Sequence, residues 1–416
     1  MKILIAGQTY YPAYNGQAIF TVNLAEGLAQ RGHEVMAVVP TLPNSDPLHK
    51  RNGVQIEELE SLPLNLLHPD AAYTLFPENS VDRLIQDYRP DIIHIQDHYS
   101  ISKAAVKIAR RQHIRVIGTN HFMPENLVPY LPLPEVVQPG MNRLLWLWML
   151  DLYNQLDAVT APSRTAAALL RQQGLSRPVF PISCGIDPQR FTPDPDLDRT
   201  AWRQRFGLDP ERKLFLFVGR VDGEKRLDVV LEALHLLKRD DIQFAIAGKG
   251  AARSKLEDQA RELGLGDRVR FIGFVPAQDL PNILNSADIF TMPSEAELLS
   301  IATLEAMACG RPILAARSNA LPELVEDGQN GFLFQPGNPH DAARKIAWLA
   351  DHPEGWAAMG SASLERVKPH HLDHVLKSYE GLYEAELGES ARTISVRRRT
   401  SRRTVRRASQ EVANRL

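Results

Sequence analysis

The segment Lys213–Arg226, K-L-F-L-F-V-G-R-V-D-G-E-K-R, decides the fold class. Its first six residues form an apolar run of the length of one buried strand. A turn that contains two glycines follows, and a helical pattern begins after it. A strand that leads through a turn into a helix is the repeating unit of a parallel sheet, because parallel strands need a long crossover connection. The segment therefore predicts an α/β protein.

Similar units recur on both sides of this segment, which predicts two mainly parallel sheets. In the second half we expect strands at Lys213–Val218, Gln243–Ala247, Val269–Ile272, Ile289–Met292, Pro312–Ala315 and Gly331–Phe334. In the first half we expect strands at Lys2–Ala6, Glu34–Val39, Asp91–Ile95, Arg115–Gly118, Asp157–Ala161 and Val179–Ile182.

The division into two domains follows from length and from a linker. A chain of 416 residues exceeds the size at which one hydrophobic core usually stops growing. The segment Gly185–Asp198 is rich in Pro and Asp and has no hydrophobic period, as expected of a linker. We therefore predict domains at 1–185 and 186–368, a helix at 369–388 and a tail at 389–416. In open α/β sheets ligands bind at the carboxyl ends of strands, so a site is expected in a cleft between the domains.

Composition excludes several classes. No run of eighteen apolar residues is present, so no transmembrane helix is expected. Cys184 and Cys309 have no C-x-x-C partner, which leaves metal and redox motifs without support and makes a reducing cytoplasm the simplest setting. The formal charge of −2 hides a basic tail, since Arg392–Leu416 holds nine arginines and one acid. That tail either lies on an anionic surface or is a solvated, disordered segment.

Two carboxylates flank a helix start in Glu297–Pro312, E-L-L-S-I-A-T-L-E-A-M-A-C-G-R-P. If the helix begins near Ser300, Glu297 lies in the preceding loop and Glu305 lies inside the helix. Free N–H groups at a helix start favour a phosphate, and a carboxylate can accept hydrogen bonds from sugar hydroxyls. The pattern suits a nucleotide sugar, while a plain core-facing helix remains an alternative.

Basic residues and glycines follow two other strands. Arg220 and Lys225 flank the turn after Lys213–Val218, where a guanidinium and an ammonium can clamp a diphosphate. Gly16 and Gln17 precede a helical pattern after the first strand, where a glycine permits close approach of a ligand. The pattern G-x-G-x-x-G is absent there, which disfavours a dehydrogenase.

Histidines occur at two strand ends. His121 follows Arg115–Gly118 and could hydrogen-bond a sugar hydroxyl or a carbonyl in the transition state, although a lone histidine is more often structural. His94 and His98 flank Gln96-Asp97, but they lack the helical i, i+4 spacing of a zinc motif, so we predict no metal site there.

In combination these motifs resemble the retaining family-four glycosyltransferases of the GT-B fold, from residue 1 to about 388. The resemblance implies two Rossmann-like βαβ domains that face each other across a deep cleft. It further implies that Arg220 and Lys225 hold the nucleotide diphosphate, that Glu305 binds the ribose, and that His121 lies near the reacting centre. Glu297 and the backbone of Leu298, Leu299, Ser300 and Ile301 would hold the donor sugar and phosphate. Gln17 stands where a second glycine is common, and Ser300 replaces a frequent glycine.

The resemblance also implies chemistry without a cofactor or a required metal. In such enzymes the acceptor attacks from the face that the nucleotide leaves, and the departing phosphate accepts the acceptor's proton. The string D-x-D occurs only in the linker, at Asp194-Pro-Asp196-Leu-Asp198, and no D-x-D metal motif is recognised elsewhere.

The acceptor follows from a narrower similarity. The stretches Thr119–Asn126 and Glu297–Thr303 are similar to those of enzymes that glucosylate diacylglycerol or related lipids. We therefore expect a hexosyltransferase that uses a nucleotide diphosphate sugar, with UDP-glucose as the working donor, and a peripheral location on the cytoplasmic face of the membrane. Trp146 and Trp148 suit a membrane interface, although a core-facing helix would also explain them.

Three alternatives stay open on the sequence. The first is the same chemistry on a soluble or polysaccharide acceptor, and the second is a GT-B nucleotide-sugar epimerase, which needs no acceptor. The third is nucleic-acid binding through the tail. It has no support in residues 1–388, because no aromatic and basic stacking surface is evident there.

Overall fold

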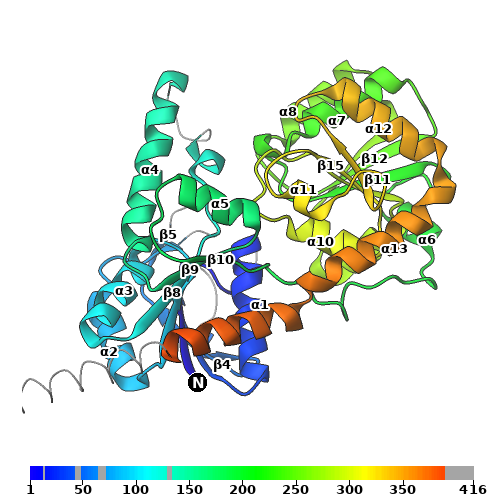
Figure 1. The fold of residues 1–416 in the computed structure, drawn as a ribbon. Coiled ribbons are helices and arrows are strands. Elements are labelled where there is room, and N and C mark those ends of the chain that lie inside the picture. The colour runs from blue at the N-terminus through cyan, green and yellow to red at the C-terminus, as the bar shows by residue number, and fades with distance from the viewer. Residues whose placement is uncertain (13–14, 43–47, 64–71, 129–133, 389–416) are drawn as a thin grey trace, which may run out of the picture.

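The computed structural model describes residues 1–12, 15–42, 48–63, 72–128 and 134–388. Its framework is two sheets, one in each half of the chain, with helices packed around each of them (Figure 1). This arrangement confirms the predicted α/β fold with two Rossmann-like domains. The first sheet ends in sequence at Pro181, and the second begins at Lys213.

Within the described residues the first sheet has eight strands in the order β10-β9-β8-β7-β1-β2-β4-β3. All its pairings are parallel except that of β3 with β4. The strands are β1 Lys2–Ala6, β2 Glu34–Pro40, β3 Lys50–Arg51, β4 Val54–Leu59, β7 Ile92–Ile95, β8 Arg115–Thr119, β9 Ala158–Ala161 and β10 Val179–Pro181. The helices of this half are α1 Gly16–Gln30, α2 Glu78–Tyr88, α3 Ser100–Gln112, α4 Gln138–Tyr153 and α5 Arg164–Gln172.

The second sheet has six parallel strands in the described residues, in the order β13-β12-β11-β14-β15-β16. They are β11 Lys213–Val218, β12 Ile242–Ala247, β13 Val269–Gly273, β14 Ile289–Met292, β15 Ile313–Ala316 and β16 Gly331–Phe334. The helices are α6 Arg199–Arg205, α7 Leu227–Leu237, α8 Arg253–Glu262, α9 Leu280–Ser286, α10 Ile301–Ala308, α11 Leu321–Leu324, α12 Pro339–Asp351 and α13 Trp356–Val367.

All twelve predicted strands are present; four have the predicted bounds and the other eight differ by one residue at one or both ends. Four further strands were not predicted. They are β3, β4 and the two-stranded pair of β5 Leu62–Pro63 with β6 Ala72–Tyr73.

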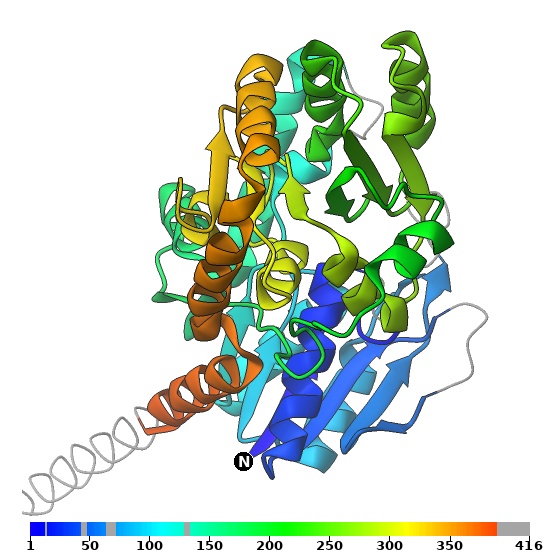
Figure 2. The same ribbon diagram turned by 90° about the vertical axis from the view of Figure 1, so that its right-hand side faces the viewer.

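The chain returns to the first sheet after α13. Residues 372–388 form a helix that lies beside α1 in both views (Figures 1 and 2). Tyr383 of this helix hydrogen-bonds His94 Nδ1 of β7 at 2.7 Å, and Glu380 pairs with Arg31 at 2.8 Å. The helix at residues 372–388 is thereby anchored on the first domain.

One sequence hypothesis, on Trp146, needs correction, and another, on the basic tail, concerns residues that the structure does not describe. Trp146 is 3% exposed and its Nε1 donates to Glu125 at 2.9 Å, so it is a core residue of α4 and not a membrane anchor. A helix that is apolar on several faces does not reveal from sequence which tryptophan is buried. Trp148 is 37% exposed. The basic tail, 389–416, lies outside the described residues.

Candidate active site

The turn at residues 219–226, which we call the basic turn, lies against the loop at residues 293–300, which we call the donor loop. They follow β11 and β14, which are neighbours in the sheet, so both emerge at the same carboxyl edge. The backbone N–H of Glu295 donates to the carbonyl of Glu224 at 3.1 Å. Arg226 Nη1 also reaches the Glu295 carboxylate at 2.6 Å. Two segments some seventy residues apart therefore form one wall.

The predicted diphosphate ligand Lys225 and the predicted sugar ligand Glu297 are direct partners. Lys225 Nζ lies 2.6 Å from Glu297 Oε1, and only 14% and 11% of the two side chains are exposed. Because both side chains are largely buried, water and salt screen this ion pair weakly. The structure thus brings these two candidates together.

Arg220 is the more accessible of the two predicted cations. Its side chain is 55% exposed, and its guanidinium contacts Asp222 at 2.5 Å and Glu224 at 2.8 Å. These two acids lie within the basic turn itself, so they fix the guanidinium locally without linking it to the donor loop. A planar guanidinium at the rim of the wall can still turn toward a phosphate.

The helix start predicted near Ser300 is present. Ser300 is the N-cap of α10, and its hydroxyl accepts from the Thr303 N–H at 3.2 Å. Glu297 therefore lies outside the helix and Glu305 lies inside it, as the spacing indicated. Leu298 and Leu299 are buried and hold the donor loop down. Ile301 is the first helical residue, so its N–H group lies at the free amino end of α10.

Glu305 is a buried carboxyl group, 7% exposed. Burial raises its pKa to about 8, and the charge of Arg190 in the linker opposes that shift. Arg190 itself donates to the carbonyl of Ala277 at 2.6 Å. A carboxyl group that titrates near neutral pH is typical of a ligand-binding position.

The first domain contributes Gly16 and Gln17 to the same region. A Cβ placed on Gly16 would lie 3.6 Å from Ile301 Cδ1, so the start of α1 touches the start of α10. Gln17 Nε2 lies 3.4 Å from Asp97 Oδ2. Asp97 is 4% exposed and also accepts from the backbone N–H of Gln8 at 2.5 Å and from Ser102 at 2.8 Å.

His121 follows β8 and faces this junction from the first domain. Its Nε2 lies 3.3 Å from Gln96 Oε1, and its ring centroid is 4.7 Å from that of Phe20 in α1. Burial lowers the pKa of His121 to about 3, so the imidazole is neutral at physiological pH. It can donate or accept a hydrogen bond without carrying a charge.

The other two histidines, His94 and His98, lie inside the first domain. His94 bonds Tyr383 and also Thr119 Oγ1 at 2.7 Å, which ties three elements together. His98 is buried among aromatic rings, with Trp148 at a centroid distance of 4.6 Å. Among the described residues no three His, Cys, Asp or Glu side chains gather as metal ligands.

Further contacts hold the two halves together around the site. Asn126 Nδ2 donates to the carbonyl of Ala296 in the donor loop at 3.3 Å, and Leu298 packs in the apolar cluster of the first domain. Glu323 of α11 accepts from the backbone N–H of Thr165 at 2.7 Å, at the start of α5. Sequence reasoning missed Asn126, Asp97 and Phe20. In the sequence, only the polar pair Gln96-Asp97 at a strand end pointed to this part of the site. The other contacts join segments that are distant in the chain, and such contacts depend on the topology of the fold.

Comparison with known proteins identifies the family. Residues 14–190 match the Glycosyltransferase Family 4 domain, and residues 198–366 match the domain of glycosyl transferases group 1. A D-inositol 3-phosphate glycosyltransferase of Catenulispora acidiphila is 30% identical over 378 residues, which cover 85% of this chain and 86% of that protein. The chain belongs to the family-four glycosyltransferases. The enzyme therefore transfers a sugar from a nucleotide sugar.

Two more comparisons give a similar protein of known activity and a similar solved structure. An alpha-monoglucosyldiacylglycerol synthase of Streptococcus pneumoniae is 27% identical over 83% of this chain and 77% of its own length. The crystal structure of Anabaena HepE in complex with UDP superposes with a TM-score of 0.74 at 20% identity, covering 92% of this chain and 100% of that one. This likeness confirms the GT-B fold. Within the described residues, the glycosyltransferase has no helix with the length and apolar character needed to cross a bilayer.

Proposed function

We propose that the glycosyltransferase moves a hexose, with retention of configuration, from a nucleotide diphosphate sugar such as UDP-glucose to a membrane lipid hydroxyl such as that of diacylglycerol. The observation that carries the donor half is the Lys225–Glu297 pair, which lies 2.6 Å apart at the start of α10. Support for the acceptor half comes from the Streptococcus pneumoniae relative, whose name specifies monoglucosyldiacylglycerol synthesis.

The charges in the wall favour departure of a diphosphate. As the bond between the sugar and the phosphate breaks, negative charge grows on the phosphate oxygen. Lys225 and the free N–H groups of α10 can stabilise that charge, and Arg220 can do so after its guanidinium turns toward the phosphate. The acceptor hydroxyl then attacks from the same face, and its proton passes to the leaving phosphate. This route needs neither a carboxylate nucleophile nor a metal ion.

Transfer of sugar to vesicles tests this proposal. We expect release of nucleoside diphosphate and a labelled lipid when UDP-glucose and diacylglycerol vesicles are both present. Transfer only to water-soluble acceptors would favour the alternative of a soluble or polysaccharide acceptor. Turnover of the donor to another nucleotide sugar without any acceptor would favour an epimerase. Absence of nucleoside diphosphate with every donor would refute the proposal.

A membrane contact is proposed for α4 and the short helix before it, Glu135–Val137. Val136, Leu144 and Leu147 are 86%, 58% and 56% exposed, and Arg143 is exposed beside them. Apolar side chains with an adjacent cation suit an anionic lipid surface.

We expect the double variant Leu144→Glu/Leu147→Glu to sediment with anionic vesicles about tenfold less than wild type, because charge on a lipid-facing position opposes burial. Deletion of Arg392–Leu416 measures the contribution of the tail, and Leu236→Glu, an exposed leucine of the second domain, is the control. Unchanged sedimentation of the double variant would exclude α4 as the contact.

The pKa of Glu305 makes donor binding dependent on pH. Its pKa is raised to about 8, so the free enzyme holds the neutral acid below that pH, whereas the ionised carboxylate accepts hydrogen bonds from ribose more strongly. We expect the donor KM to fall about tenfold between pH 6.5 and pH 8.5. Glu305→Gln should remove this dependence. A wild-type donor KM that does not change over this range would rule out the ribose role.

The raised pKa of Glu305 affects folding stability in the opposite direction from donor binding: a rise in pH favours binding of the donor and lowers stability. In the unfolded chain Glu305 ionises near its usual pKa of 4.5, while the folded protein retains the proton until about pH 8. The folded state binds more protons between these values, so the contribution of Glu305 to stability is lost as pH rises from 4.5 to 8. Thermal unfolding of wild type and Glu305→Gln without donor checks this sign.

A further inference from the structure

The start of α5 in the first domain is completed by a residue of the second domain. Ser163 is the N-cap of α5, and its hydroxyl accepts from the Ala166 N–H at 3.0 Å. A helix start leaves its first N–H groups without intrahelical partners. Here the N–H groups of Arg164 and Thr165 donate to the Glu323 carboxylate of α11, at 3.2 Å to Oε2 and at 2.7 Å to Oε1. The two helices meet where the two halves of the chain come together (Figure 1).

Glu323 makes this contact as an anion. Its side chain is 19% exposed, and Arg164 Nε also lies 3.3 Å from Oε2. Burial acts to raise the pKa of Glu323, but the hydrogen bonds from Thr165 and Arg164 outweigh it and hold the pKa below its usual value. The positive end of the helix dipole favours a carboxylate at this place as well. The contact therefore joins the two domains through both charge and hydrogen bonds.

The residues directly before α11 hold the backbone of the donor loop. Ser318 Oγ donates to the carbonyl of Glu295 at 3.0 Å, and the Ala320 N–H donates to the carbonyl of Glu297 at 3.2 Å. We call residues 318–324 the α11 segment. One end of this segment binds the donor loop, and the other end carries the carboxylate that caps α5.

The donor-loop carbonyl between these two is held from the first domain. Asn126 Nδ2 donates to the carbonyl of Ala296 at 3.3 Å, so three successive carbonyls of the donor loop are bound by groups from both domains. Leu298, which follows them, packs in the apolar cluster of the first domain. The position of Glu297, whose carboxylate pairs with Lys225, therefore depends on how the two domains meet.

We propose that Glu323 is a positioning residue for sugar transfer, because its cap on α5 fixes the α11 segment and thereby the donor loop that presents Glu297. A small displacement of a group that holds a substrate lowers the rate of a reaction strongly. In the proposed mechanism the diphosphate is bound by the second domain, through Arg220 and Lys225. Loss of the cap is therefore expected to slow transfer more than it weakens nucleotide binding. This inference rests on the proposed function, in which the donor loop holds the donor sugar.

Variants on both sides of the contact test the inference. Glu323→Ala removes the acceptor, and Thr165→Pro removes the 2.7 Å donor at a position in the first turn of α5, where proline is tolerated. We expect each to lower kcat about tenfold while the Kd for UDP changes less than about threefold. Glu323→Gln keeps an oxygen for the Thr165 N–H and should recover part of kcat. The double variant Glu323→Ala/Thr165→Pro should be no slower than the slower single variant, since both act through one contact.

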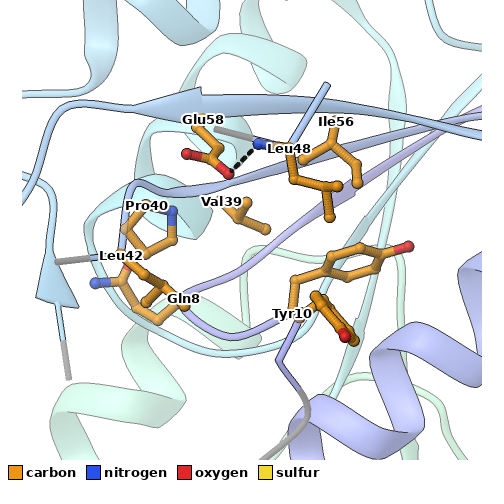
Figure 3. A pocket seen from close by; sticks show the side chains of 9 residues that line it. Gln8, Tyr10, Val39, Pro40, Leu42, Leu48, Ile56 and Glu58 are labelled. Atoms are coloured by element: carbon orange, nitrogen blue, oxygen red, sulfur yellow. Dashed lines mark hydrogen bonds between the residues drawn. The ribbon is translucent and has the colours of Figure 1, made fainter. Parts of the chain in front are cut away.

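Small-angle X-ray scattering tests the same contact without turnover. With UDP present, we expect Glu323→Ala and Thr165→Pro to have a larger radius of gyration than the wild type, because a bond between the domains is lost. Glu58→Gln is the matched control. Glu58 lines a small cavity inside the first domain, where its Oε1 accepts from the backbone N–H of Leu48 at 3.0 Å (Figure 3). This variant should match the wild type in kcat and in radius of gyration.

The outcomes separate this inference from the proposed function. If the wild type releases no nucleoside diphosphate with any donor, the proposed function fails, and the radius of gyration then decides the inference by itself. If the wild type turns over and both single variants keep its kcat, the inference is overturned. Equal losses of kcat and of UDP binding would assign Glu323 to the stability of the second domain and would also overturn it. Circular dichroism establishes that each variant is folded.

Discussion

Replacing Lys225 by alanine is expected to lower kcat/KM by about 100-fold or more, because in the proposed mechanism its ammonium group stabilises charge that develops on the departing diphosphate. Its side chain is only 14% exposed, so water screens the charge weakly. The substitution also leaves the largely buried Glu297 carboxylate without its cation, and the unpaired negative charge would repel the phosphate. Most of the loss should therefore appear in kcat. Steady-state release of nucleoside diphosphate measures it.

The control for this variant is Lys213→Ala in the same domain. Lys213 pairs with Asp241 at 2.6 Å, at the opposite, amino end of β11, and should leave kcat/KM within about twofold of wild type. Arg220→Ala, which removes the exposed cation of the basic turn, should also cost about 100-fold. A Lys225→Ala enzyme within a few-fold of wild type would contradict the role of this charge. Non-additive losses in Lys225→Ala/Glu297→Ala would show that the pair acts as a unit.

Most of the strands that the sequence predicted are buried on both faces, with β10 and β13 as the exceptions. β11 and β12 are largely apolar because helices cover each side of the sheet. β4 is different, since V-Q-I-E-E-L buries Val54, Ile56 and Leu59, exposes Gln55 and leaves both acids partly buried. A strand near the sheet edge with one solvent-exposed face has a weaker hydrophobic pattern in the sequence. The two-residue strands β3, β5 and β6 are too short to have such a pattern.

Local chemistry at the site was predictable, and its long-range contacts were not. Ser300 is a good N-cap residue, so the start of α10 and the placement of Glu297 and Glu305 followed from spacing. The bond between Lys225 and Glu297 depends on β14 lying next to β11, and strand order cannot be derived from periodicity. The contact of Gly16 with Ile301 depends further on how the two domains meet.

Replacing His121 by alanine is expected to lower kcat about 100-fold while the donor KM changes less than about threefold. His121 belongs to the first domain, where Gln96 orients its Nε2 at 3.3 Å and the Phe20 ring packs beside it, so it faces the acceptor side of the junction. In the proposed mechanism this group hydrogen-bonds the reacting hydroxyl in the transition state and leaves the nucleotide to the basic turn and the donor loop. The loss should therefore appear in turnover and not in donor binding.

The protonation state of His121 distinguishes hydrogen bonding from charge stabilisation. Its pKa is lowered to about 3 by burial, so the neutral ring persists throughout the working range and His121 should contribute no inflection to the pH–rate profile between pH 5 and pH 8. His121→Asn, which keeps a donor and an acceptor, should recover part of the lost kcat, whereas a cationic role would not be restored by an amide. His340→Ala, an exposed histidine at the start of α12, is the matched control and should behave as wild type. If His121→Ala instead raises the donor KM and leaves kcat intact, the imidazole serves the nucleotide sugar and the acceptor side of the junction must be sought elsewhere.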